Sequence, residues 1–80
     1  LMWLQVLYDL PVTTDAKRKA AVEFRDFLLD LGFEMSQYSV YQRCCSGKEM
    51  AEALTAKIEK NLPRYGRIHI LMITDKQYEK

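Results

Sequence analysis

The hydrophobic and polar positions follow two different periods in the first part of the chain. Residues 2–8 are rich in side chains typical of a mostly buried strand, and this run ends at residues 9–11, Asp-Leu-Pro. A helical period follows, and either Thr13 or Thr14 can cap its start. The apolar positions of this helix share one face and comprise Ala20, Phe24, Phe27, Leu28 and Leu31. The helix is expected to end there, because Gly32 follows where a left-handed C-cap costs least.

The second part of the chain predicts further strands and one more helix. Residues 33–45 favour extended chain but are long for one strand, so two short strands or one sharply bent strand are expected. Residues 46–49 have the S-x-x-E form of a capping box and predict a helix start. The buried stripe of that helix comprises Met50, Ala51, Leu54, Ile58 and, as a further candidate, Leu62, and Pro63 with Gly66 marks its exit. Residues 67–74 form a nearly continuous apolar run that suits the middle of a sheet.

This order of elements predicts an α+β fold of the ferredoxin-like type. The pattern is a βαββαβ sandwich, with an antiparallel sheet and two helices on one face. Eighty residues, of which 49% are hydrophobic and 29% charged, correspond to a single domain over residues 1–80. A domain of this size without disulfides commonly gains stability by pairing with a copy of itself, so a homodimer is expected. The fold hosts many unrelated functions and assigns none by itself.

Composition excludes several classes of protein. No apolar stretch approaches the ~20 residues that cross a bilayer and no signal peptide is present, which indicates a cytoplasmic protein without a membrane span. Adjacent Cys44 and Cys45 rarely reach disulfide geometry and are expected to be structural thiols. With His69 as its single histidine, the chain cannot form the common zinc-binding motifs, and His69 is expected to be a packed or edge histidine. With Lys+Arg 12 against Asp+Glu 11, binding to nucleic acid would depend on how the charges are placed.

Asp9 is the first candidate for chemistry, because it directly follows a hydrophobic strand and therefore lies at the edge of the sheet. The alternative is a loop acid that makes local turn hydrogen bonds. One carboxylate is too little for a catalytic magnesium site. Two copies of Asp9 facing each other across a dimer axis could share a hard metal ion, Mg²⁺ or Mn²⁺, whose Lewis acidity would activate a water and stabilise charge on a phosphodiester.

Basic residues form a second candidate site. Arg18 and Arg25 nearly superimpose on a helical wheel and point away from the apolar stripe, with Lys17 and Lys19 beside them. Arg43 is a further residue that could contact phosphate groups. The alternative is an ordinary solvated surface, since acidic residues share the first helix, namely Glu23, Asp26 and Asp30.

Several tyrosines are candidates for stacking on nucleic-acid bases. They are Tyr8, Tyr38, Tyr41 and Tyr65. No ribonucleoprotein signature accompanies them. Most of these rings are therefore expected in the core or in an interface.

A set of short segments occurs in a familiar order along the chain. They are YDLPVTT at residues 8–14, FRDFL at 24–28, GF at 32–33, QYSVYQR at 37–43, NLP at 61–63, Gly66, and ITDKQY at 73–78. Over essentially residues 2–78, this combination closely resembles the small CRISPR-associated protein two family, particularly the form found with type II systems. The resemblance implies a ferredoxin-like homodimer that bridges dimers of the CRISPR integrase subunit during spacer acquisition. It also implies a metal-dependent endonuclease or endoribonuclease activity.

The resemblance further implies roles for individual residues. The acid that closes the first strand, Asp9, would be the catalytic and metal-binding residue, contributed by both subunits, with Tyr8 beside it in the motif. Arg18 and Arg25, and then Arg43, are the candidates for the backbone of double-stranded protospacer DNA, with RNA as the other nucleic-acid substrate. Whether the adaptation role needs cleavage is a separate question.

One departure from the family and one competing function remain open at this point. Family members usually continue into a C-terminal segment whose extra strand pairs with the partner subunit, whereas this chain stops at Lys80. Absence of that strand would expose a sheet edge. The alternative function is a small-molecule-sensing ferredoxin-like dimer that binds a metabolite at its interface.

Overall fold

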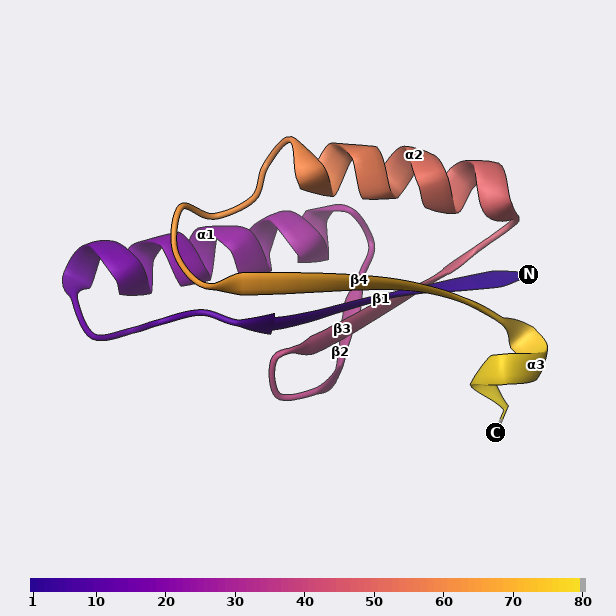
Figure 1. The fold of residues 1–80 in the computed structure, drawn as a ribbon, viewed down its shortest axis with the longest axis horizontal. Helices are drawn as coiled ribbons and strands as arrows, with labels where there is room; N and C mark the ends of the chain where they lie inside the picture. Colours follow the sequence, from indigo (N-terminus) through magenta and orange to yellow (C-terminus); the bar gives the residue numbers. More distant parts are fainter. Residues whose placement is uncertain (80) are drawn as a thin grey trace.

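The computed structural model describes residues 1–79 and shows a four-stranded sheet with two long helices and one short helix (Figure 1). The elements are β1 (Met2–Asp9), α1 (Asp15–Asp30), β2 (Glu34–Gln37), β3 (Val40–Cys45), α2 (Lys48–Glu59), β4 (Arg67–Thr74) and α3 (Asp75–Tyr78). Helices α1 and α2 lie over one face of the sheet, and α3 lies beyond the opposite face near both chain ends. The predicted ferredoxin-like α+β fold is confirmed, including two short strands within residues 33–45. Among residues 1–79, no helix has the length and apolar character needed to cross a membrane.

The strands follow the order β2-β3-β1-β4, and every neighbouring pair is antiparallel. The prediction that residues 67–74 form a middle strand is wrong, because β4 lies at an edge and pairs only with β1 within residues 1–79. Its apolar run has a different cause. Ile68, Ile70 and Met72 pack against the core, whereas the alternate residue Leu71 is 48% exposed. The apolar residues of β4 therefore point to both sides of the sheet, some into the core and some toward solvent.

The core lies between the sheet and the two long helices. Leu4 and Val6 of β1 are fully buried, as are Leu28 of α1 and Ile58 of α2. The predicted apolar faces of both helices are confirmed at these positions. Leu62 is the exception, because it lies beyond the end of α2 and is 49% exposed.

The helix ends confirm one predicted cap and correct another. Thr14 caps α1, since its Oγ1 accepts a hydrogen bond from the backbone N–H of Lys17 at 3.2 Å. The predicted capping box at residues 46–49 is wrong. The N-cap of α2 is Gly47, and the Ser46 hydroxyl donates instead to the sulfur of Met50 at 3.6 Å. Ser46 is one residue too early, because β3 runs to Cys45 and the chain needs one more extended residue before the helix begins.

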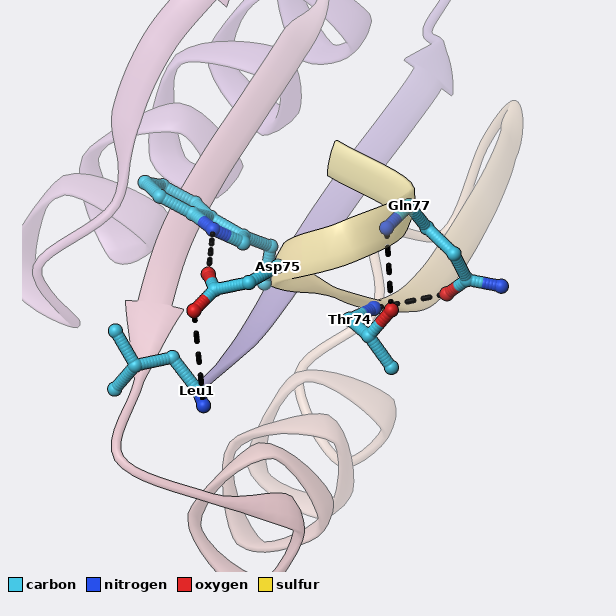
Figure 2. Close-up of polar contacts among 5 residues, drawn as sticks. Leu1, Thr74, Asp75 and Gln77 are labelled. Carbon is cyan, nitrogen blue, oxygen red and sulfur yellow. Dashed lines mark hydrogen bonds and ion pairs between the residues drawn. The ribbon is translucent and has the colours of Figure 1, made fainter. Parts of the chain in front are cut away.

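The short helix α3 was not predicted, and polar contacts hold it against the sheet. Thr74 and Gln77 form a reciprocal capping box, with hydrogen bonds of 3.2 and 2.8 Å (Figure 2). The indole N–H of Trp3 donates to Asp75 at 2.9 Å, and the Trp3 ring stacks on Tyr78 with ring centroids 4.1 Å apart. The side-chain amide of Gln42 donates to the Tyr78 hydroxyl at 3.0 Å. Helix α3 therefore covers one end of the sheet face that α1 and α2 leave open.

Candidate functional site

Asp9 closes β1 on the face of the sheet away from α1 and α2, which we call the far face. Side chains alternate along a strand, so Asp9 shares this face with Gln5 and Leu7, while Leu4 and Val6 point into the core. Asp9 is exposed, and neither a hydrogen bond nor an ion pair engages its carboxylate within residues 1–79. The local turn hydrogen bonds considered as its alternative role are therefore not seen.

A glycine fixes the position of Asp9 from the neighbouring strand. Gly66, directly before β4, has a φ of +87°, which is a left-handed conformation that suits glycine. A Cβ at this position would collide with the backbone oxygen of Asp9 and lie 2.7 Å from Cδ2 of Leu10. Only glycine therefore allows β4 to begin this close to the end of β1.

Three residues on β4 share the far face with Asp9, and the sequence did not assign them to this site. Arg67 lies directly opposite Asp9 in the antiparallel register, so the two side chains project to the same side of the sheet. His69 and Leu71 follow on that side at alternate positions, and both are exposed. His69 is thus the expected edge histidine. The alternation of polar and apolar residues over 67–70 is the signal that could have identified this shared face.

Asp9 and Tyr8 are neighbours in the sequence but lie on opposite faces. The Tyr8 ring stacks on Tyr41 at 5.8 Å and meets the edge of Phe24 at 5.6 Å, on the helix-covered side. Burial, together with the side chain of Tyr41, raises the pKa of Tyr8 well above its usual range. These ring contacts place Tyr8 on the helix-covered side, so it does not belong to the surface around Asp9.

The candidate arginines occupy two different environments. Arg18 donates to the backbone oxygen of Val12 at 2.9 Å and pairs with Asp15, and Arg25 pairs with Asp26 at 3.5 Å. The Arg18 and Arg25 side chains are 54% and 51% exposed, as a solvent-facing basic row requires.

Arg43 does not join this row. Its guanidinium lies 3.7 Å from the sulfur of Met50, and its Nε would be 2.8 Å from a Cβ at Gly32. Arg43 is half-buried there, at the C-terminal end of α1.

The two exposed arginines line a groove between α1 and the β2–β3 turn, which we call the hairpin groove. Its volume is about 430 Å³, and its walls include Tyr8 and Tyr41 from the sheet and Tyr38 from the turn. The hairpin groove lies on the helix-covered side of the molecule. Asp9 is not among its lining residues.

The cysteines also divide between the two faces. Both thiols are free, and Cys45 is buried whereas Cys44 is exposed. Burial raises the pKa of the Cys45 thiol. Cys45 therefore matches the expected structural thiol. The same expectation is wrong for Cys44, which lies exposed on the far face, opposite Trp3, because adjacent residues of a strand face opposite sides.

The described part of one chain does not hold a complete set of protein ligands for a metal ion. Within residues 1–79, no group of three or more His, Cys, Asp or Glu side chains is placed to hold a metal ion. Asp9 supplies a hard oxygen ligand of the type that Mg²⁺ prefers, and Mg²⁺ sites commonly combine one or two such carboxylates with waters and substrate phosphates. The other ligands of a metal ion at Asp9 would be waters, substrate phosphates or groups from a second subunit.

The fold and site define a small ferredoxin-like domain with an exposed strand-end carboxylate on its far face. The family model described as CRISPR associated protein Cas2 matches residues 2–80. The CRISPR-associated endoribonuclease Cas2 of Paracidovorax avenae is 52% identical over 80 residues, which cover 100% of this chain and 74% of the relative. The proteins of the same name from Flavobacterium psychrophilum and Ligilactobacillus salivarius are 48% and 46% identical over 77 residues, covering 96% of this chain and 67% and 76% of the relatives. The chain belongs to the CRISPR associated protein Cas2 family, which confirms the resemblance carried by the short segments.

Proposed function

We propose that this protein acts in CRISPR adaptation as a homodimer that cleaves RNA at a pair of Asp9 carboxylates and holds the backbone of duplex DNA on its basic surface. In this role the dimer bridges two dimers of the integrase subunit. The relatives described above are named endoribonucleases, which supports the activity. The observation that carries the proposal is the placement of Asp9, which is exposed, has no partner within residues 1–79 and is held in place by Gly66.

The far face supports pairing with a second copy. Helix α3 covers one end of this face through Trp3, whereas the end near Asp9 presents Leu7, Val40 and Leu71. A two-fold interface uses the same patch on both subunits, so stacking two far faces would bury these apolar residues and repeat Asp9 across the axis. The dimer thereby supplies the second carboxylate that one chain lacks.

The chemistry of this paired site follows from its residues. Two Asp9 carboxylates would hold Mg²⁺ or Mn²⁺ by hard oxygen ligation. The bound ion would supply Lewis acidity at the phosphodiester. Arg67, opposite Asp9 on the same face, can donate paired hydrogen bonds to phosphate oxygens and so orient the RNA backbone.

Replacement of Asp9 tests the proposed cleavage. Asp9→Asn keeps the size of the side chain but removes its charge, and we expect metal-dependent cleavage of a labelled RNA to fall more than about a hundredfold, beyond the effect of losing an outer-shell partner. The assay follows product on denaturing gels with Mg²⁺, Mn²⁺ or chelator. Asp30→Asn, which alters an exposed acid at the end of α1, is the matched control and should keep wild-type activity. Retained cleavage by Asp9→Asn would contradict the proposal.

The dimer is tested by a charge placed on the far face. Leu71→Lys puts an ammonium group into the proposed interface, and we expect sedimentation analysis to show a monomer. Leu62→Lys is the matched control, because Leu62 is exposed to the same degree, 49% against 48%, but lies in the α2–β4 loop. If both variants sediment like the wild type, the interface is elsewhere.

The DNA surface is tested by its dependence on salt. Reversing Arg18 and Arg25 to Glu removes two phosphate contacts, so the slope of log affinity for a duplex against log salt should become shallower by about 2. Reversing Lys57 and Lys60 on or just after α2 makes the same change in net charge and serves as the control. An unchanged slope in the arginine variant would exclude this surface. Arg43, which is half-buried, is expected to make a smaller contribution.

A further inference from the structure

The hairpin groove has no role in the chemistry proposed for the far face. Its volume is about 430 Å³, and three tyrosine rings and two arginines contribute to its walls. The rings are those of Tyr8, Tyr38 and Tyr41, and the cations are Arg18 and Arg25 on α1. Aromatic rings beside a row of cations are the combination that binds single-stranded nucleic acids, because bases stack on the rings while the cations contact the phosphates.

The most exposed of these rings is held on a fixed turn. Tyr38 is 90% exposed, so its ring contributes almost no buried surface to the stability of the fold. The backbone N–H of Tyr8 donates to the backbone oxygen of Ser39 at 3.1 Å, and the hydroxyl of Ser36 donates to that of Val40 at 3.3 Å. Ser39 itself adopts a φ of +63°, an uncommon conformation for a residue other than glycine. These contacts fix the backbone of the turn, which presents the Tyr38 ring to solvent.

The cations on the opposite wall are also positioned. The Val12 carbonyl holds the Arg18 guanidinium at the mouth of the groove, and about half of this side chain is exposed. Arg25 lies seven residues further along α1, which places the two Cα atoms about 10 Å apart on one side of the helix. Their acidic neighbours Asp15 and Asp26 form exposed ion pairs, which contribute little and can be exchanged for phosphate.

We propose that the hairpin groove is a subsite for an unpaired nucleotide of a single-stranded nucleic acid, with its base stacked on Tyr38 and its phosphates contacted by Arg18 and Arg25. The two arginines favour this polyanion over an apolar peptide segment as the occupant. The inference rests on the proposed function, because it presumes binding of nucleic acid.

The test measures stacking and affinity without cleavage. The protein carries Asp9→Asn, and the probe is a short RNA that contains one 2-aminopurine, whose fluorescence is quenched when the base stacks. We expect Tyr38→Ala to weaken binding about 5- to 150-fold and to abolish the quenching, as expected for the loss of one stacked base. Tyr38→Phe keeps the ring and should stay within about twofold of the parent protein. Tyr65→Ala, a partly exposed tyrosine outside the groove, is the matched control.

A duplex of the same sequence separates base stacking from general affinity. Its bases are already paired and stacked, so Tyr38→Ala should leave duplex binding within about twofold. If Tyr38→Ala weakens binding to the single strand and to the duplex equally, the proposed subsite is wrong. It is also wrong if Tyr38→Ala and Tyr65→Ala show the same affinity and the same quenching. Because Tyr38 is exposed, its variants should keep the wild-type circular dichroism spectrum. The readout uses uncleaved RNA, so failure of the Asp9 cleavage test leaves this result interpretable, and failure here leaves the Asp9 proposal standing.

Discussion

The two faces of the sheet differ although the same strands build both. Along β1, Leu4 and Val6 are fully buried beneath α1 and α2, whereas Leu7 and Asp9 belong to the far face. Alternation of side chains thus separates the residues that stabilise the fold from the residues proposed for chemistry. Substitution of Asp9 should therefore alter cleavage with little loss of stability, whereas substitution of a residue buried between the sheet and the helices should mainly lower stability.

The sharpest test of this separation is a pair of neighbouring leucines on α1. Leu28 is fully buried, and Leu28→Ala should lower the free energy of unfolding by about 2 to 5 kcal/mol, because it removes buried methyl groups and leaves a cavity. Leu29 is 45% exposed, and Leu29→Ala should change it by no more than about 0.5 kcal/mol. Urea denaturation of both variants measures the difference. Equal effects would contradict the assignment of the covered face as the core.

A second pair of substitutions tests the contact that holds the end of β1. Gly66→Ala forces a Cβ against the Asp9 backbone and into a left-handed conformation, which should cost about 1 to 3 kcal/mol of folding free energy. Gly47→Ser is the control, because Gly47 has extended backbone, open space around it and the N-cap position of α2. It should be neutral or stabilising by a few tenths of a kcal/mol. Thermal unfolding that ranks the two variants the other way would refute this account of Gly66.

The smallest expected effect concerns the end of the far face that α3 covers. Asp75→Ala removes the acceptor of the Trp3 indole N–H, so the protein should lose about 1 kcal/mol of stability. Trp3 is the only tryptophan, and its fluorescence should shift to longer wavelength as α3 loosens. Asp30→Ala is the control, because it also removes a carboxylate but Asp30 is exposed and makes no contact with Trp3. An unchanged Trp3 spectrum in Asp75→Ala would show that the contact does not hold α3.

The sequence predicted the elements better than their positions in the sheet. The strand ends at Asp9 and Thr74 follow from local patterns, and the structure confirms them. The sequence left the cap of α1 open between Thr13 and Thr14, and the structure places it at Thr14. The edge position of β4 was missed, because an apolar run looks the same whether both faces are buried or one is left open. The proximity of Arg67 to Asp9 was also missed, since it depends on the register between strands that are far apart in the sequence.

The hairpin groove was only partly predictable. Helical spacing placed Arg18 and Arg25 on one side of α1, and the structure confirms that both are exposed. No local pattern indicated that Tyr38 would face them, because its place depends on the turn between β2 and β3 and on a backbone hydrogen bond to β1. Tyr8 was placed beside Asp9 by the motif, and only the strand geometry shows that they face opposite sides.

The central claim is that two Asp9 carboxylates, one from each subunit of a dimer, form one cleaving site. Wild-type and Asp9→Asn chains, mixed in equal amounts and allowed to exchange subunits, test it directly through the rate of RNA cleavage per total protein. If both carboxylates are required, only dimers with two wild-type chains are active, and the rate should be about a quarter of that of the wild type. A rate of about one half would contradict the claim, because it would show that each Asp9 acts alone.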